Sequence, residues 1–297
     1  GTIYSFGYNS DGQLGNGTST TSATTTPQRV QDGNNYTGTT YLGDNTRNPV
    51  VKIAAGYRFS LALTLDGSVY GFGDNGLGQL GDASLSDRNT PVRSQDGAYS
   101  GTTYLGDNLA NPIVDISAGI HHSIALAADG TVYGFGYNNN GQLGDNTTTQ
   151  RTTPIQVLDG TYAGTAYLGD DSNNPVLSVK AGGYHTLALT ADGSVYGFGR
   201  NSNRQLGDST TTQRNTPVQV LKGEYEGNRY LGDSIDNPIA AIGAGYYHSY
   251  AMAQSGVVYS FGLNGNGQLG VATTISNYYT PVESWNVDLI DDDLPAA

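Results

Sequence analysis

The sequence contains no cysteine, few charged residues and no long apolar run. The absence of cysteine excludes disulfide bonds and thiolate metal sites. Charged residues form only 13% of the chain, and 26 acidic residues outnumber 13 basic ones, which gives a formal net charge of −13. Because an acidic surface repels phosphate, we expect neither nucleic acid nor an anionic membrane as a partner. The absence of any run of about 18 apolar residues argues against membrane insertion.

Glycine and tyrosine are abundant, with 43 and 22 residues, and both recur at regular intervals. A Gln-Leu-Gly motif begins at Gln13, Gln79, Gln142, Gln205 and Gln268, and a Tyr-Leu-Gly-Asp motif begins at Tyr41, Tyr104, Tyr167 and Tyr230. The first Gln-Leu-Gly interval is 66 residues and all later intervals of both motifs are 63. A fixed period over the whole chain identifies a tandem-repeat protein.

One unit predicts four short strands. Apolar segments at 113–116 and 123–126 come first, and the Asp129-Gly130 pair, typical of a type I′ turn, leads into a third strand at 131–136. A fourth strand at 154–157 opens with proline and is therefore expected at a sheet edge. Four strands per unit without helical periodicity predict an all-β protein, a β-propeller of four-stranded blades.

The number of repeats predicts four and a half blades. The third and fourth strands occur five times and the first and second four times, which makes 18 strands. We interpret residues 1–297 as a single repeat domain. It divides into a partial unit (1–48) and repeats 49–111, 112–174, 175–237 and 238–297, the last with an irregular acidic tail. The alternatives are a five-bladed ring with an irregular closing blade and an open fragment of a larger ring. We favour the fragment, because the chain begins inside a repeat, and an open ring predicts self-association.

The combined motifs of one unit resemble a known family. Ala118-Gly119, His122-Ser123, Asp129-Gly130 and the run Gly141-Gln142-Leu143-Gly144-Asp145 are similar to the regulator of chromosome condensation repeat. The resemblance covers essentially the whole chain and implies a propeller, usually of seven blades of close to fifty residues. The present units are longer because each carries an inserted Tyr-x-Gly-x-x-Tyr-Leu-Gly-Asp segment. We therefore expect a bacterial-type member that is extracellular or on the cell surface.

The shared polar residues are assigned to the fold, and neither a metal nor a cofactor is expected. Three histidines (His122, His185 and His248) occupy one repeat position and could form a metal cluster. Phe59 holds the same position in another unit, which favours a packing role.

The aspartate- and asparagine-rich loops could bind calcium, but turn formation explains their composition. In the Gln-Leu-Gly loops, we expect the leucine to lie in the core and the glutamine amide to form hydrogen bonds with the backbone. Arg204 stands where other copies have glycine, which suggests that the turn does not require glycine.

Two loops vary between otherwise constant units, and these positions are free to serve binding. They follow Phe-Gly or precede the histidine position, and they are rich in tyrosine and arginine, which are enriched at protein-interface hot spots. The predicted binding residues are Tyr8, Tyr57, Arg58, Asp74, His121, Tyr137, Tyr184, Arg200, Tyr246 and Tyr247.

These patterns predict a non-catalytic binding scaffold that recognises a protein or a glycan. No catalytic residues are expected, because adjacent strand residues such as His122 and Ser123 point to opposite faces. One alternative is a structural spacer or filament domain of a large surface protein. Another is the exchange of nucleotide on a small GTPase, which the family resemblance implies. The acidic charge and the lack of a basic tail make this last function less favoured.

Overall fold

The computed structural model describes residues 1–33, 36, 40–101, 103–271 and 275–284, which form 18 strands and contain no helix. The predicted number of strands is confirmed. The strands are β1 (Tyr4–Asn9), β2 (Thr20–Arg29), β3 (Val50–Ala55), β4 (Phe59–Thr64), β5 (Val69–Gly73), β6 (Arg88–Arg93), β7 (Ile113–Ala118), β8 (His122–Ala127), β9 (Val132–Gly136), β10 (Arg151–Gln156), β11 (Val176–Ala181), β12 (His185–Thr190), β13 (Val195–Gly199), β14 (Arg214–Gln219), β15 (Ile239–Ala244), β16 (His248–Ala253), β17 (Val258–Leu263) and β18 (Asn277–Glu283). The acidic tail after Trp285, expected to be irregular, lies outside the described residues.

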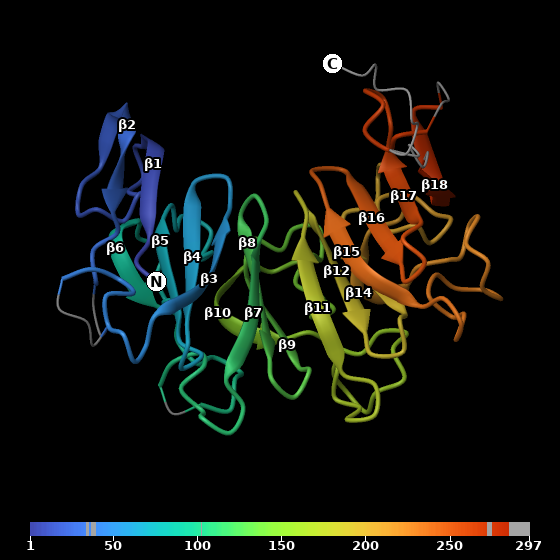
Figure 1. Cartoon of the computed structure of the whole chain (residues 1–297), viewed down its shortest axis with the longest axis horizontal. Helices are drawn as coiled ribbons and strands as arrows, with labels where there is room; N and C mark the ends of the chain where they lie inside the picture. The colour runs from blue at the N-terminus through green and yellow to red at the C-terminus, as the bar shows by residue number, and fades with distance from the viewer. Residues whose placement is uncertain (34–35, 37–39, 102, 272–274, 285–297) are drawn as a thin grey trace, which may run out of the picture.

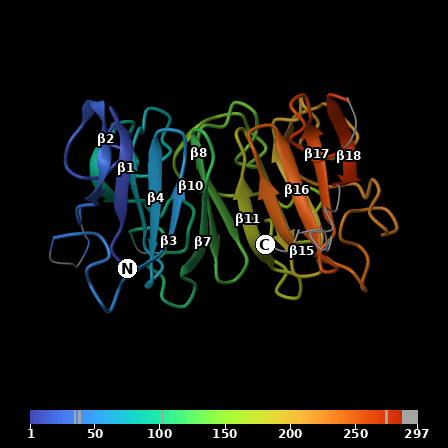
Figure 2. The same ribbon diagram turned by 45° about the horizontal axis from the view of Figure 1, so that its top comes forward.

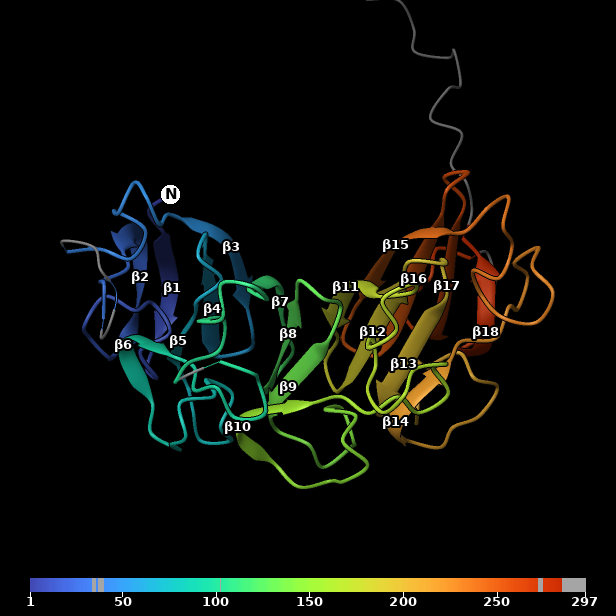
Figure 3. The ribbon, with the colours of Figure 1, turned by 90° about the horizontal axis from the view of Figure 1, so that it is seen from below.

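The strands form four antiparallel four-stranded sheets and one two-stranded sheet. We call β3–β6, β7–β10, β11–β14 and β15–β18 blades I to IV, and β1–β2 the half-blade. In each blade the strands follow one another in chain order, and the first strands β3, β7, β11 and β15 contact one another in succession. Figure 3 shows these first strands on the inner side of the arc and the proline-containing β6, β10 and β14 on the outer side. The fourth strand is thus an edge strand, as predicted.

The blades are arranged as an open arc. Figures 1 and 2 show the half-blade at one end of the molecule and β17 and β18 of blade IV at the other. Over the described residues no closed ring forms, so the predicted propeller architecture is confirmed in its open version. At the half-blade end of the arc, Tyr4 and Phe6 are exposed by 54% and 67%. Self-association through this edge stays a prediction.

The hairpin between the second and third strands differs from the type I′ turn predicted from Asp129-Gly130. Gly130 has a φ of 93°, but Asp129 is not in the positive-φ region. Gly130 N–H donates to the Ala127 carbonyl at 3.0 Å, which closes a turn over residues 127–130. The loop is therefore longer than the two-residue loop of a type I′ hairpin, and Gly130 comes after the two central residues of the turn. The Asp129 carboxylate accepts from the Thr131 N–H at 2.9 Å instead of leaving its backbone in a left-handed conformation.

The core lies between neighbouring blades. Phe135 of blade II is fully buried and belongs to one apolar cluster with Leu80, which blade I contributes through its Gln-Leu-Gly loop. A Cβ atom on Gly81 would lie 2.9 Å from the Phe135 ring, so this glycine leaves room for the phenylalanine. Gln79 Oε1 accepts from the Leu77 N–H at 2.9 Å. The expected roles of leucine and glutamine in these loops are therefore confirmed.

The inserted segment packs between its own blade and the next one along the chain. In the second full unit, Tyr162 is buried, donates through its hydroxyl to the Asn174 carbonyl at 2.6 Å and meets the Tyr196 ring edge-on at 5.6 Å. Asp170 Oδ2 accepts from the Tyr167 N–H at 3.0 Å. Burial raises the pKa of Tyr162, which keeps its hydroxyl a donor. These tyrosines serve packing, which leaves the variable loops as the candidate binding positions.

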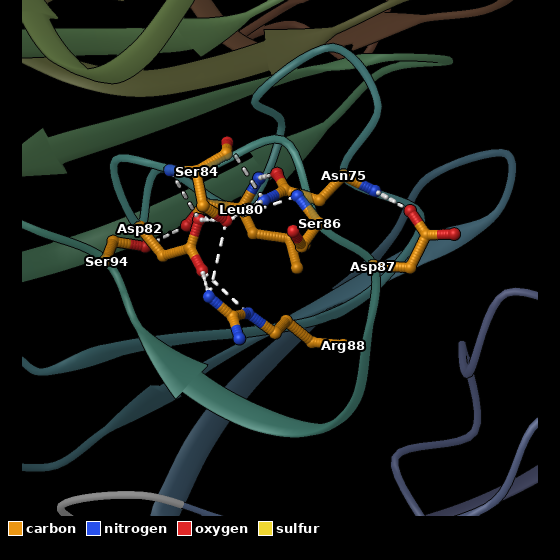
Figure 4. Close-up of polar contacts among 8 residues, drawn as sticks. All are labelled: Asn75, Leu80, Asp82, Ser84, Ser86, Asp87, Arg88 and Ser94. Carbon is orange, nitrogen blue, oxygen red and sulfur yellow. Dashed lines mark hydrogen bonds and ion pairs between the residues drawn. The ribbon is translucent and has the colours of Figure 1, made fainter.

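The loop between the third and fourth strands is a closed polar network, and Figure 4 shows the copy in blade I. Asn75 Nδ2 donates to Asp82 Oδ1 at 2.8 Å, and Arg88 Nε donates to Asp82 Oδ2 at 2.8 Å. Burial raises the pKa of Asp82, but hydrogen bonds from Ser84, Arg88 and Asn75 outweigh it, so the pKa lies below its ordinary value. The carboxylate is held by arginine, which accounts for the acidic residue without a calcium ion.

The turn at Arg204 accommodates a residue other than glycine, as the sequence suggested, but its backbone is left-handed. Arg204 has a φ of 68°, close to the 73° of Gly141 and the 79° of Gly78 at the same repeat position. This conformation is strained for a side chain with a Cβ atom. Arg204 Nη1 donates to the Asn277 carbonyl at 2.8 Å and its guanidinium stacks 3.3 Å above the Tyr279 ring centroid. Contacts with blade IV therefore offset the strain of this arginine.

Candidate binding surface

The two variable loops lie at the same end of each blade and are joined through the backbone. The residue after Phe-Gly donates its N–H to the carbonyl of the residue before the histidine position. In blades I, II, III and IV these bonds run from Asp74 to Arg58, Tyr137 to His121, Arg200 to Tyr184 and Leu263 to Tyr247, at 2.8–2.9 Å. Because only backbone atoms take part, the side chains at these positions are free to vary without loss of the blade.

The side chains of these loops pair across the contact between neighbouring blades. The Arg58 guanidinium lies 5.5 Å from the centroid of the Tyr8 ring, at the distance of a cation–π contact. His121 Nδ1 lies 3.7 Å from Asp74 Oδ2. The remaining two pairs are Tyr137 with Tyr184, whose ring centroids are 6.0 Å apart, and Arg200 with Tyr247, at 4.8 Å. Each contact between blades thus carries at least one pair of variable residues.

Further ring contacts join these pairs into one line, which we call the aromatic ladder. Tyr57 meets His121 at 6.0 Å, His121 meets Tyr137 at 6.4 Å, and Tyr184 meets Tyr246 at 5.9 Å. The ladder comprises Tyr8, Tyr57, Arg58, Asp74, His121, Tyr137, Tyr184, Arg200, Tyr246 and Tyr247. All ten predicted binding residues therefore lie together, although Tyr8 and Tyr247 are far apart in the sequence. A binding role for them stays a prediction.

The ladder borders a concave, solvent-accessible region near the inner strands. A hollow of about 300 Å³ is lined by the Ala-Gly pairs of the four blades, with Tyr57 and Tyr246 at its edge. Tyr57 and Tyr246 are 65% and 49% exposed. A Cβ atom on Gly119 would lie 2.6 Å from the Gly182 carbonyl oxygen of the next blade. This close approach of the Ala-Gly pairs brings the variable loops of successive blades side by side.

Charges along the ladder are unevenly compensated. Arg58 Nη1 lies 3.3 Å from Asp11 Oδ2, and this carboxylate raises the pKa of Arg58. Burial lowers the pKa of His121, more than the neighbouring Asp74 raises it, so His121 is neutral near pH 7. His121 therefore brings no positive charge to Asp74 near pH 7.

Sequence reasoning missed two residues that support the ladder. Asp11 binds Arg58, and Ser202 Oγ accepts from Arg200 Nε at 2.8 Å. The signal for both is the one that identified the rest: they differ between units. Position 11 corresponds to Leu77, Asn140, Asn203 and Asn266, and position 202 corresponds to Ser10, Gly76, Asn139 and Gly265. The variable region thus extends beyond the single residue after Phe-Gly into the loop that follows.

The family model for the RCC1-like domain matches residues 1–287. The chain belongs to the RCC1-like domain family. Its similarity to the ultraviolet-B receptor UVR8 of Arabidopsis thaliana is 28% identity over 97% of this chain and 55% of that protein. The probable E3 ubiquitin-protein ligase HERC4 of Homo sapiens is 33% identical over 78% of this chain and 19% of that protein. The chain spans about half the length of the first relative and about a fifth of the second.

The solved structures agree with this fold. The crystal structure of Prp20p from Saccharomyces cerevisiae matches with a TM-score of 0.70 and 22% identity, covering 97% of this chain and 60% of that one. The resemblance to the regulator of chromosome condensation repeat, drawn from the motifs alone, is therefore confirmed. In the described part of this RCC1-like chain, no helix is long and apolar enough to cross a membrane.

The histidines of the RCC1-like repeat connect the blades. His185 Nε2 lies 2.9 Å from Ser249 Oγ of the next blade, and Ser249 Oγ donates to the Gln205 carbonyl at 2.7 Å. Because the serine proton is used on Gln205, Nε2 of His185 must carry the proton and donate. His122 makes the same contact with Thr186 at 3.2 Å. The packing interpretation is therefore confirmed. The described residues contain no cluster of three or more potential metal ligands of the His, Cys, Asp or Glu type.

Acid is expected to destabilise the RCC1-like fold through these histidines. Burial lowers the pKa of His185 from 6.5 to about 3. The unfolded chain therefore binds a proton below about pH 6.5 that the folded chain resists, so stability is lost as the pH falls from 6.5 toward 3. In His185→Phe we expect a smaller loss of unfolding free energy between about pH 7 and about pH 5 than in the wild type.

Urea unfolding at the two pH values measures this difference. Phenylalanine fits this repeat position, because Phe59 is buried there with 1% exposure. The variant is therefore expected to fold at neutral pH, where it loses only the hydrogen bond to Ser249. An acid-induced loss equal to that of the wild type would show that protonation of His185 does not limit the stability of the folded chain.

Proposed function

We propose that this RCC1-like chain is a non-catalytic binding module that recognises a protein through the aromatic ladder. One observation carries the proposal: the residues that the blade does not need come together in one contiguous line. Ring after ring, with centroids 4.2–6.4 Å apart, the ladder crosses all four blades. A set of variable side chains scattered over the surface would not support recognition of a common partner.

The chemistry of the ladder suits a protein partner. Tyrosine and arginine make up most of it, and both combine an apolar contact surface with hydrogen-bonding groups, as at binding hot spots. The backbone bonds below the ladder hold its loops in place, so that little ordering is required on binding. Among relatives, Prp20p was solved together with a study of its binding to Gsp1p and histones. By analogy with such protein-binding members, a protein partner is preferred here to a glycan.

The remaining parts of the proposal concern location and the other functions. An extracellular or cell-surface location, expected from the sequence, stays part of it. Nucleotide exchange on a small GTPase is less favoured, because the resemblance to the name-giving exchange-factor family lies in the motifs that build the blades. Function in this family is carried by surface residues rather than by the shared fold, so the ladder is the place to test it.

Replacing Tyr137 and Tyr184 together by alanine tests the ladder directly. We expect at least a tenfold loss of affinity for ligands selected on the wild-type chain, since each tyrosine removes a hot-spot-sized contact. Ligands are selected from a displayed random-peptide library and a glycan array, and affinities are measured by isothermal titration calorimetry.

The matched control is the double alanine variant of Tyr4 and Phe6, which are exposed by 54% and 67% and lie outside the ladder. This variant is expected to bind the selected ligands as the wild type does. Equal losses in the two double variants, or no loss in either, would place the binding surface elsewhere. Thermal unfolding of each variant confirms that the fold is retained.

A further inference from the structure

Arg200 occupies a preformed position at one end of the ladder. Its guanidinium lies 4.8 Å from the centroid of the Tyr247 ring and 5.8 Å from that of Tyr184. Nε donates to Ser202 Oγ at 2.8 Å, and Nη1 lies 3.5 Å from the Tyr247 hydroxyl. Two aromatic rings and a serine thus orient the side chain. These contacts leave further guanidinium N–H groups for another acceptor, because arginine carries five.

Arg200 is not neutralised by an acidic side chain. Arg58, the other arginine of the ladder, is paired with Asp11 at 3.3 Å. In the polar loops, Arg88, Arg151 and Arg214 are likewise bound to aspartates. By contrast, no carboxylate of the described residues lies within 4.0 Å of the Arg200 guanidinium. On a chain with a net charge of −13, this cation is held at the binding surface without a counter-charge.

The blade does not need an arginine at this position. The equivalent residues are Tyr8, Asp74, Tyr137 and Leu263. All the copies in the four-stranded blades make the same backbone hydrogen bond to the loop before the second strand. A side chain that is tolerated as tyrosine, aspartate or leucine has no fixed structural task. The charge of Arg200 is therefore available for a ligand.

The surroundings of Arg200 define the chemistry of that ligand. A planar guanidinium with free N–H groups binds a carboxylate through two parallel hydrogen bonds. The Tyr246 ring, 49% exposed, lies 4.2 Å from Tyr247 and adds an apolar contact surface beside the charge. We propose that Arg200, Tyr184, Tyr246 and Tyr247 form a carboxylate-binding subsite of the ladder for an acidic polypeptide segment, in which an aspartate or glutamate adjoins an apolar residue. This inference rests on the proposed binding function.

The arrangement of the rings favours a polypeptide over an acidic sugar. Neighbouring rings of this part of the ladder are tilted by 65–78° to one another. Flat sugar rings stack best on a broad aromatic face, whereas steeply tilted rings form separate slots that accept individual side chains. A polypeptide presents such side chains at regular intervals on both sides of its backbone.

The experiment begins with selection of random peptides on the full 297-residue chain. Peptides whose binding is lost in the Tyr137 and Tyr184 double alanine variant are kept, and the most enriched one is synthesised. We expect this peptide to contain aspartate or glutamate and to bind Arg200→Gln at least tenfold more weakly than the wild type. Arg200→Lys, which keeps the charge but loses the planar fork, is expected to fall between the two.

Two controls separate charge recognition from other effects. Arg229→Gln removes an arginine that stacks 5.0 Å from the Tyr230 ring in an insert, outside the ladder, and is expected to bind as the wild type does. A peptide with its acids replaced by asparagine and glutamine is expected to bind the wild type as weakly as the acidic peptide binds Arg200→Gln. Because other residues stand at this position in other blades, each Arg200 variant is expected to unfold at the wild-type temperature.

The outcomes distinguish this inference from the proposed function. Ladder-dependent peptides that lack acids, or that bind Arg200→Gln as tightly as the wild type, would overturn the carboxylate subsite and leave the ladder as a binding surface. Binding only of acidic glycans would overturn the choice of a polypeptide. If the selection yields no ligand that depends on the ladder tyrosines, the proposed function and this inference both fail.

Discussion

Replacing Phe135 by alanine is expected to lower the free energy of unfolding by about 3–5 kcal/mol, the range for a large aromatic side chain removed from a core. Phe135 is fully buried in the apolar cluster between blades I and II. The cavity would open against Leu80 and Gly81, whose backbone conformation is fixed by their loop and offers little room for collapse. Chemical denaturation of the purified variant, monitored by tyrosine fluorescence, measures the change.

Phe6 provides a control at the same repeat position. It is 67% exposed, whereas Phe135 is fully buried between two blades. Phe6→Ala is therefore expected to change the unfolding free energy by no more than about 0.5 kcal/mol. A loss at Phe6 as large as the loss at Phe135 would mean that the contact between blades is not the source of the stability.

The second large effect is expected at Gly130, in the hairpin that supports the next blade. A Cβ atom there would lie 2.5 Å from Pro175 Cβ, and the φ of 93° is unfavourable for any other residue. Gly130→Ala is expected to cost about 1–2 kcal/mol for the backbone conformation and a further ~1–3 kcal/mol for overpacking. Thermal and urea unfolding both report the loss.

Gly256 separates these two contributions. It occupies the same repeat position in blade IV with a φ of 91°, and nothing lies within 4 Å of an added Cβ atom. Gly256→Ala is thus expected to cost only the conformational part, about 1–2 kcal/mol. If the two alanine variants lose the same stability, the contact between Gly130 and Pro175 contributes nothing.

The sequence predicted the blades well because their determinants are local. Short apolar strands, proline at the edge strand and the buried leucine of Gln-Leu-Gly all follow from residues within one unit. Recurrence of each unit then supplied the number of strands. The same local reasoning was wrong for the Asp129-Gly130 hairpin, since the loop length depends on the hydrogen bond that Gly130 forms with Ala127.

The candidate site was only partly predictable, for a geometric reason. Variation between units identified the ladder residues one by one, but which of them meet depends on how each blade is rotated against the next. That rotation is set by contacts such as the one between Gly119 and Gly182, and the sequence motifs do not predict its angle. The contacts of Arg204 were unpredictable for a similar reason: its strained backbone is stabilised by Asn277 and Tyr279, which lie about 75 residues further along the chain.

The pairing of variable residues across blade contacts has a consequence for how such a surface can evolve. Each pair joins the position after Phe-Gly in one unit to a position before the second strand of the next, and the same arrangement recurs between complete blades. In-frame loss of residues 112–174 would remove His121 and Tyr137 and bring Asp74 against Tyr184. Duplication or loss of one 63-residue segment by unequal recombination therefore generates a new combination of ligand-facing side chains on an unchanged scaffold, without any point mutation.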